Sequence, residues 1–261
     1  MSTQCRATFS LRRLRGIFLF AISIPLLNAA CAINPELDLA QLSSAEAPVS
    51  VTQVPFYPQL EYQCGPAALA GALGAAGVET DPAALAPQVY LPARQGSLQV
   101  ELLAATRRAG RVAYLPGPDP RELIAQLESG RPVLVLQNLR TRHFPVWHYA
   151  LVVGYDPMAN RLLLNSGEQQ GMSMDARRFM RTWDWAGRWS MVVLEPGALP
   201  ANPDVHKLLM AVAAFEAVAG AEAALPSWRA IANHWPRDSR AHLALGNAAY
   251  ARQDLPGAIT H

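Results

Sequence analysis

The sequence predicts an α+β domain followed by an all-helical segment, and three observations support this order. Residues 65–128 are rich in Ala and Leu and carry helix-start signals. Residues 132–195 contain apolar runs of strand length. Beyond Pro200 the chain returns to Ala-rich stretches of helical length. Helices and strands that occupy separate blocks of sequence are typical of an α+β domain with an antiparallel sheet.

The front block is expected to contain four helices. Pro is favoured in the first turn of a helix, Ser and Asp are favoured just before it, and Gly often follows its end. These signals place helices at residues 65–77, from Asp81-Pro82 onward, from Ser97 to Arg108, and from Asp119-Pro120 to Glu128.

The back block is expected to form the sheet, with strands at residues 132–137, 149–155, 161–165 and 189–195. A turn at residues 156–160 makes the middle two strands a hairpin. In this hairpin we expect Tyr155 to pair with Arg161 and Leu151 to pair with Asn165.

The N-terminus has the layout of a signal peptide. Residues 1–15 are basic, residues 16–27 are apolar but too few to span a bilayer comfortably, and small residues precede Cys31. A cysteine after small residues resembles a bacterial lipobox, although Asn28 stands where Leu is usual. We expect a signal peptide at residues 1–30, a lipidated Cys31 that anchors the exported chain to the membrane facing the periplasm, and a tether over residues 31–50. Cleavage near Ala30 or Ala32 without lipid is the alternative.

Charge and cysteine content narrow the function classes. The chain has 22 basic and 20 acidic side chains, and four of the basic ones lie among the first thirty residues. The mature chain is therefore near neutral and gives no indication of a nucleic-acid partner. Only three cysteines are present, and no Cys/His grouping has the spacing of a metal site. We expect no metal and no other cofactor.

Residues 203–261 are expected to form helical repeats with a period of 34 residues. The positions of a tetratricopeptide repeat are occupied by Phe215, Ala224, Trp228 and Pro236 in one copy, and by Leu245, Gly246 and Ala258 in a second. The sequence ends at His261 inside the second copy, and one and a half repeats do not bury their own faces. We expect either a truncated array or packing against the preceding domain, with a protein partner bound by the repeats.

Cys64 is the candidate nucleophile. Gly65 and Pro66 favour a turn into the Ala-rich helix, so Cys64 is expected at a helix N-terminus. There the helix dipole favours the thiolate and lowers the pKa of a cysteine. If Cys31 carries lipid, Cys64 also has no disulfide partner in an oxidising compartment. The alternative is that Cys64 is a small buried hydrophobic residue.

His148 is the candidate base because it opens an apolar strand, where a polar side chain can face a cleft. His143 lies in a basic loop, and the other histidines lie in the helical segment. A third residue should orient the imidazole. Asp156 is eight residues along the strand from His148, which is roughly 26 Å at ~3.3 Å per residue. Asn165, with the adjacent Ser166, returns toward the His148 end, so Asn165 is the expected orienting residue.

Gln59 is the candidate second donor to the oxyanion, beside the backbone N–H of Cys64. A side-chain amide just upstream of the nucleophile suits this role, and Gln59 is separated from Cys64 by a short loop. Gln63 has the same chemistry, but it directly precedes Cys64 and is expected to point away.

These motifs resemble the bacteriocin-processing, double-glycine peptidase family. The likeness rests on Gln59 ahead of Cys64-Gly-Pro-Ala, on His148 opening a Val-rich strand before Gly-Tyr-Asp, and on Asn165-Ser-Gly after the hairpin. It implies a papain-like fold for residues 51–198 and a Cys-His-Asn triad. The chain as a whole resembles proteobacterial lipoproteins that join such a domain to tetratricopeptide repeats. It differs from transporter-linked members, which have Asp in place of Asn165 and a Gln one residue further from the cysteine.

The resemblance implies an exported cysteine peptidase that hydrolyses peptide bonds in a peptide or protein substrate. Two other functions fit the same residues. One is an inactive peptidase-like scaffold that binds through its helical repeats. The other is a thiol acyltransferase, in which the same cysteine transfers an acyl group to an acceptor other than water.

Overall fold

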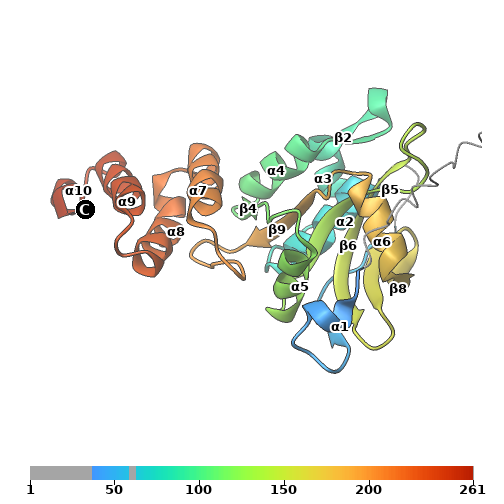
Figure 1. The fold of residues 1–261 in the computed structure, drawn as a ribbon. Coiled ribbons are helices and arrows are strands. Elements are labelled where there is room, and N and C mark those ends of the chain that lie inside the picture. The colour runs from blue at the N-terminus through green and yellow to red at the C-terminus, as the bar shows by residue number, and fades with distance from the viewer. Residues whose placement is uncertain (1–36, 59–62, 261) are drawn as a thin grey trace, which may run out of the picture. The chain divides into compact units, whose positions relative to one another are not determined.

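The computed structural model describes residues 37–58 and 63–260 (Figure 1). These described residues all belong to one compact unit. The expected signal peptide, the lipid site at Cys31 and the oxyanion residue Gln59 all lie outside the described residues.

The described elements alternate between short helices and strands before a run of helices at the C-terminal end. In chain order they are α1 (Leu39–Leu42), β1 (Val49–Ser50), α2 (Cys64–Ala75), α3 (Pro82–Val89), β2 (Tyr90–Leu91), a 3-10 turn (Pro92–Arg94), β3 (Gly96–Ser97), α4 (Gln99–Arg108), β4 (Val112–Tyr114), α5 (Pro120–Glu128), β5 (Val133–Asn138), β6 (Trp147–Asp156), β7 (Arg161–Ser166), β8 (Gln169–Asp175), α6 (Ala176–Asp184), β9 (Ser190–Leu194), α7 (Val205–Ala219), α8 (Ala221–His234), α9 (Ser239–Ala251) and α10 (Leu255–Thr260).

A seven-stranded sheet forms the centre of the domain. Its strand order is β4-β9-β5-β6-β7-β8, and β1 pairs with the far end of β6. Every pairing in this sheet is antiparallel. The α+β prediction is therefore confirmed, with helices α2 to α5 preceding most of the strands along the chain.

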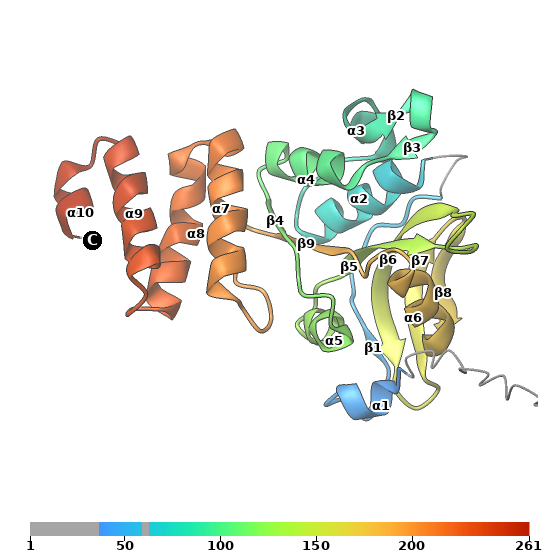
Figure 2. The ribbon, with the colours of Figure 1, turned by 45° about the horizontal axis from the view of Figure 1, so that its top comes forward.

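The two faces of the sheet carry separate hydrophobic clusters, because successive side chains of a strand point to opposite sides. Leu134 and Leu136 of β5, with Tyr149 and Leu151 of β6, pack against α2, α3 and α4. We call this side the α2 face. The alternate residues of the same strands, Val133, Val135, Ala150 and Val152, pack against α5 and α6. We call this side the α6 face. Figure 2 shows the two groups of helices on opposite sides of the sheet.

The β6–β7 hairpin forms with the predicted turn, and one of its two predicted pairs is shifted. Leu151 pairs with Asn165 as expected, but Tyr155 pairs with Leu162 instead of Arg161. The register shifts by one residue between Val152 and Gly154. A Cβ atom on Gly154 would collide with the backbone carbonyl oxygen of Val49 in β1. The close approach of β1 at this bulge therefore requires glycine.

Helix starts follow the predicted signals where an aspartate precedes proline. The Asp81 carboxylate accepts a hydrogen bond from the backbone N–H of Ala84 at 2.8 Å, and the Asp119 carboxylate accepts one from Arg121 at 2.9 Å. Ser97 does not cap α4 as predicted. It pairs with Tyr90 in a short hairpin, and Leu98 precedes α4 without a side-chain cap.

The domain begins before the predicted boundary at Val51. Leu37 and Leu39 are only 4% and 0% exposed, and β1 joins the main sheet. Leu37 and Leu39, within the expected tether, are therefore part of the hydrophobic core. The strands β4 and β8 were also not expected. Strand β8 is mostly polar and exposed, so it lacks the apolar run that indicates a strand.

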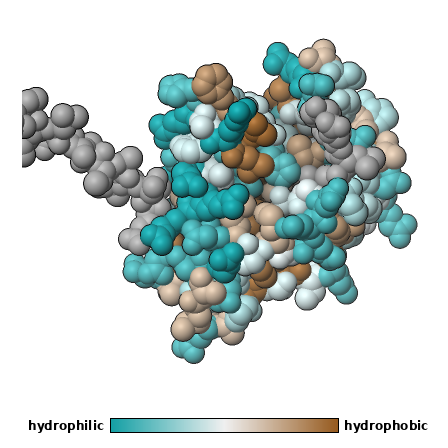
Figure 3. Space-filling view, turned by 90° about the vertical axis from the view of Figure 1, so that its right-hand side faces the viewer, coloured by the Kyte–Doolittle hydropathy of each residue, from teal (hydrophilic) through white to brown (hydrophobic). Residues whose placement is uncertain are grey.

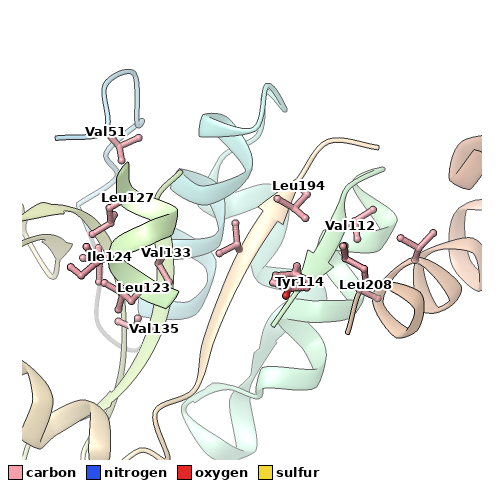
Figure 4. Close-up of a cluster of buried hydrophobic side chains, with 14 of the residues drawn as sticks. Val51, Val112, Tyr114, Leu123, Ile124, Leu127, Val133, Val135, Leu194 and Leu208 are labelled. Carbon is pink, nitrogen blue, oxygen red and sulfur yellow. The ribbon is translucent and has the colours of Figure 1, made fainter. Parts of the chain in front are cut away.

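The C-terminal helices repeat at the predicted interval and pack on the domain. Helix α9 begins at Ser239, 34 residues after α7 begins at Val205, and α10 follows α8 by the same interval. Leu208 of α7 joins the hydrophobic cluster that contains Val112 and Tyr114 of β4 (Figure 4). Of the two expected arrangements, packing against the preceding domain is observed. The assignment of these helices to the tetratricopeptide type stays a prediction.

Across residues 37–58 and 63–260, no helix combines the length and the apolar character needed to cross a membrane.

Candidate active site

Cys64 is the first residue of α2, as the sequence predicts. Pro66 lies in the first turn, where its missing N–H is not needed, and the following Ala-rich run favours helix. Leu69 and Leu73 are fully buried on the α2 face and fix the helix against the sheet. Gln63 precedes the helix and makes no side-chain cap. The backbone N–H groups in the first turn are therefore not capped by Gln63, and those of Cys64 and Gly65 can donate toward the Cys64 sulfur.

Burial raises the pKa of the Cys64 thiol above its ordinary value. Backbone N–H groups of Tyr149, Gly65 and Cys64 donate toward the sulfur and act in the opposite direction, but burial is the larger effect. The expectation that the helix N-terminus lowers this pKa is therefore wrong. Its physical reason holds, since the amides do favour the thiolate, but desolvation of the half-buried sulfur outweighs them.

His148 is the second residue of β6 and pairs across the sheet with Gln137 of β5. Burial lowers the pKa of the imidazole from 6.5 to about 4. The ring nitrogen Nε2 lies 2.8 Å from the hydroxyl oxygen of Ser166. At neutral pH the imidazole is uncharged and the thiol is protonated, so the resting pair consists of two neutral groups.

Cys64 and His148 line one cleft of about 990 Å³, although 84 residues separate them along the chain. The cleft is also lined by residues 94–99, from the β2–β3 hairpin to the start of α4, and by Gly167 and Glu168 of the β7–β8 turn. The floor contains Tyr149, whose ring packs edge-on against Trp189 with centroids 5.9 Å apart. A thiol and an imidazole thus line one cavity whose size is typical of a ligand site.

Asn165 is buried and lies next to Ser166 in β7, but its side chain forms its hydrogen bond with β8. Its Oδ1 atom accepts a hydrogen bond from the backbone N–H of Gly171 at 3.0 Å. Asn165 pairs with Leu151, so its side chain points to the α2 face, whereas Ser166 shares the α6 face with Ala150 and His148. His148 therefore contacts Ser166 and not the predicted Asn165.

A buried polar pair lies on the α6 face beside His148. Gln137 donates from Nε2 to the Thr182 hydroxyl at 2.7 Å, and Thr182 donates to the carbonyl oxygen of Phe179 at 2.9 Å. Because the single Thr182 proton goes to Phe179, the hydroxyl can only accept from Gln137, which fixes the orientation of the amide. The Gln137 Oε1 atom is buried and has no partner among the described residues.

The wall of the cleft beside Cys64 depends on Gly65. A Cβ atom at this position would collide with the Ser97 hydroxyl and would lie 2.6 Å from the Ser97 Cβ atom. The β2–β3 hairpin therefore approaches α2 closely only because residue 65 has no side chain. The Ser97 hydroxyl oxygen is buried there, with no hydrogen-bond partner in the part of the chain that the structure describes.

The rim of the cleft on the β5–β6 side is apolar and exposed. Val146 and Trp147 line the cleft, and Phe144 lies in the same exposed loop. Asn138 holds this loop, because its amide donates to the carbonyl oxygen of Thr141 and its oxygen accepts from the N–H of Val146. Figure 3 shows, on the face at the right-hand side of Figure 1, hydrophobic residues in small patches among hydrophilic ones.

The described residues contain no group of three or more His, Cys, Asp or Glu side chains that could hold a metal ion.

Residues 51–191 match the Peptidase_C39 like family. The chain belongs to this family. The C39-like peptidases are cysteine peptidases, so the family agrees with a thiol and an imidazole that share a cleft. The match spans most of the sheet domain and stops before the C-terminal helices. No curated protein matches the chain significantly.

Solved structures with C39-type descriptions are also similar to the chain. One is a C39-like peptidase from Bacillus anthracis, with 18% identity over 56% of this chain and 97% of that one, and a TM-score of 0.46. Another is a double glycine motif protease from an AMS/PCAT transporter in complex with the leader peptide, with 18% identity over 57% and 98% of the two chains and a TM-score of 0.42. A third is the peptidase domain of Streptococcus ComA, with 19% identity over 54% and 98% and a TM-score of 0.43.

The sequence prediction therefore brought Cys64 and His148 to one site and missed Ser166 as the group in contact with the imidazole. A signal for Ser166 was present. Leu151 was predicted to pair with Asn165, and side chains alternate along a strand. Residues 148 and 166 then fall on one face and residue 165 falls on the other.

Proposed function

We propose that the chain is a cysteine peptidase that hydrolyses peptide bonds, with Cys64 as nucleophile and His148 as general base and acid. One observation carries this proposal: in a chain of a cysteine peptidase family, a helix-start cysteine and a strand histidine line one cleft. A peptide or protein substrate follows from the family and from the size of the cleft.

The chemistry balances with these two groups and water. His148 takes the thiol proton as the Cys64 sulfur attacks the carbonyl carbon of the scissile bond. The imidazolium then gives this proton to the leaving amine nitrogen, and the acyl group stays on the sulfur as a thioester. His148 next takes a proton from water, which attacks the thioester carbonyl, and the thiol is reformed by the returned proton.

The developing oxyanion needs hydrogen-bond donors. The backbone N–H of Cys64, at the start of α2, is one donor with the correct chemistry. We assign the second to the side-chain amide of Gln59 on sequence grounds. A Gln59→Ala variant is expected to lose about 10²–10³-fold in kcat, as other enzymes do when one oxyanion donor is removed.

The test is peptide cleavage by the full chain, by Cys64→Ala and by His148→Ala. A mixture of peptides of varied sequence is incubated with each protein, and new peptide ends are identified by mass spectrometry. We expect cleavage by the wild-type chain and a loss of at least about 10³-fold in each variant. Cleavage that persists in Cys64→Ala would contradict the assignment. Products whose acyl part carries an added amine instead of water would indicate acyl transfer.

A scaffold without activity is the second candidate, and one observation favours it. The pKa of Cys64 is raised and that of His148 is lowered, so neither group is charged at neutral pH. Alkylation of Cys64 as a function of pH separates the two candidates. A rate that climbs only above pH 9 and is the same in His148→Ala supports the scaffold, whereas a rate that depends on His148 supports the peptidase.

We further propose export through the N-terminal segment, with a lipid on Cys31 that anchors the chain at the membrane facing the periplasm. The support is the basic and apolar pattern of residues 1–30 and the position of the cysteine after it. An intact mass that includes acyl chains on a new N-terminal cysteine is the expected result, and a mass without them would contradict the anchor.

The C-terminal helices are proposed to recruit a protein partner as tetratricopeptide-type repeats. The 34-residue interval between equivalent helices supports this assignment. Deletion of α9 and α10 is expected to leave cleavage of short peptides unchanged and to reduce binding of the partner protein.

A further inference from the structure

We propose that Ser166 is the residue that positions His148, so that this chain uses a Cys-His-Ser arrangement in which the orienting group is a neutral hydroxyl. This inference rests on the proposed peptidase function and deepens it. The third role was expected of Asn165, and the structure separates the two neighbouring residues by their contacts and by the face of the sheet on which each lies.

The hydrogen-bond contacts of the two neighbouring residues differ. The Ser166 hydroxyl lies 2.8 Å from Nε2 of His148, at hydrogen-bond distance. Asn165 accepts from the backbone N–H of Gly171 at 3.0 Å. Ser166 and Asn165 are 9% and 7% exposed, so neither side chain exchanges its partner freely with water.

The register of the sheet places Ser166 and His148 on the same face. Leu151 pairs with Asn165, and the next residues along the two strands place Ser166 opposite Ala150. Ala150 and His148 are two residues apart on β6, so His148 and Ser166 are diagonal neighbours on the α6 face. A strand must slip by one residue to bring Asn165 onto that face, and such a slip would turn Leu162 and Leu164 away from the hydrophobic cluster of the α6 face.

The chemistry of a hydroxyl suits this position. Nε2 is committed to Ser166, which leaves Nδ1 to take the proton from the Cys64 thiol. In the neutral ring Nε2 then carries hydrogen and donates to the Ser166 oxygen, and it still donates after Nδ1 is protonated. Ser166 therefore holds the ring in both states. A hydroxyl has no negative charge, so it orients the imidazole without stabilising the imidazolium as a carboxylate does.

The other charged and titratable groups around His148 come from several elements. Cys64 of α2, Arg94 of the 3-10 turn, Tyr149 of β6 and Glu168 of the β7–β8 turn line the same cleft. Glu168 is the carboxylate among them, and no hydrogen bond between it and His148 is found within the described residues. The effect of a carboxylate placed at residue 166 can therefore be measured against a background that lacks a carboxylate contact to the ring.

The experiment compares Ser166→Asp with Asn165→Asp in the full chain. The two variants add the same charge one residue apart. We measure the imidazole titration of His148 by NMR, assigned with His148→Ala, and the rate of Cys64 alkylation by iodoacetamide from pH 5 to 10. An acidic partner within about 4–6 Å shifts a pKa by roughly 1–3 units. Ser166→Asp is expected to raise the His148 pKa by more than one unit and the alkylation rate at pH 6 by about tenfold or more.

Asn165→Asp is expected to shift the His148 pKa by less than about half a unit and the alkylation rate by less than about threefold, because its carboxylate lies on the other face of the sheet. A larger effect from Asn165→Asp than from Ser166→Asp would overturn the proposal and return the role to Asn165. Equal effects would also overturn it, since they would show that the contact with Ser166 is not specific.

A second pair of variants covers the case in which a buried aspartate prevents folding. Ser166→Ala removes the hydroxyl, and Ser166→Thr keeps it. With a peptide cleaved by the wild-type chain, we expect Ser166→Ala to lower kcat by about tenfold with little change in KM, and Ser166→Thr to recover most of the loss. Equal losses in both would indicate a packing role and contradict the proposal.

The outcomes also separate this inference from the proposed function. If no peptide is cleaved by the wild-type chain, the peptidase proposal fails, but the NMR titration and the alkylation rates still report on the contact with Ser166. If peptides are cleaved and the two aspartate variants behave alike, the peptidase proposal stands and the role of Ser166 is rejected.

Discussion

The two faces of the sheet are built from the same strands, yet they contribute different parts of the site. The α2 face supplies Cys64 from the start of a helix, and its buried Asn165 is bonded to the backbone of β8. The α6 face supplies the groups around the imidazole, with Ser166 on Nε2 of His148 and Gln137 as the cross-strand neighbour. The position of Cys64 thus depends on helix packing, and the position of His148 depends on strand register. Both residues line the same cleft.

The largest expected effect comes from removing the packing of the α6 face. Trp183 is 0% exposed, and its Nε1 atom donates to the carbonyl oxygen of Trp189 at 2.9 Å. Trp183→Ala is expected to lower the free energy of unfolding by about 3–5 kcal/mol, through lost burial and a cavity. Urea unfolding measures this change.

Trp185 provides the matched control at the end of the same helix. Its ring is partly exposed, with the Arg181 guanidinium carbon 5.8 Å from the ring centroid. Trp185→Ala is expected to cost about 1 kcal/mol. Equal losses in the two variants would show that α6 is not held by Trp183, and the contrast between a buried and an exposed face of α6 would fail.

The second prediction concerns the protonation of the buried His148 imidazole on the α6 face. Burial lowers the pKa of His148 from 6.5 to about 4, so the unfolded chain takes up this proton first as the pH falls. Stability is therefore lost between pH 6.5 and about 4, by about 3 kcal/mol from this group, and is fully present above pH 6.5. Urea unfolding at pH 7 and at pH 4 measures the loss. His148→Gln should show a correspondingly smaller loss, and an identical loss would mean that other groups cause it.

The third prediction tests how closely the β2–β3 hairpin approaches α2 on the α2 face of the sheet. Gly65→Ala places a Cβ atom against the Ser97 side chain and is expected to destabilise the protein by about 1–3 kcal/mol. In a Ser97→Gly background the obstructing atoms are absent, so the same substitution should cost much less. A double-mutant cycle by thermal or urea unfolding measures the coupling. Additive effects would show that the two residues do not collide.

The smallest expected effect compares helix caps on the two faces. The Asp175 carboxylate accepts from the N–H of Arg178 at the start of α6, and Asp81 caps α3 in the same way. Asp175→Ala and Asp81→Ala are each expected to cost about 1 kcal/mol in unfolding free energy. Arg177→Ala, at an exposed position of α6, is the control and should change stability by less than about 0.5 kcal/mol. A cap that costs no more than this control would contradict the assignment.

Local signals in the sequence were sufficient for several elements. Asp-Pro pairs located the starts of α3 and α5, and apolar runs located β5, β6 and β7, because caps and hydrophobic periodicity act within a few residues. The pairing of Leu151 with Asn165 followed from the turn. Strand β8 was missed because it is mostly polar and exposed and therefore lacks an apolar run. The buried segment at Leu37 and Leu39 was missed because it is held by contacts with residues far away in the sequence.

For the site, the sequence by itself determined that Cys64 begins a helix and that His148 begins a strand, since both follow from neighbouring residues. Only the tertiary structure decided that the two line one cleft. It also decided that burial outweighs the helix amides at Cys64 and that Ser166, not Asn165, contacts the imidazole. The physical reason is that desolvation and the facing of side chains depend on what packs against each strand, and those partners lie far away in the sequence.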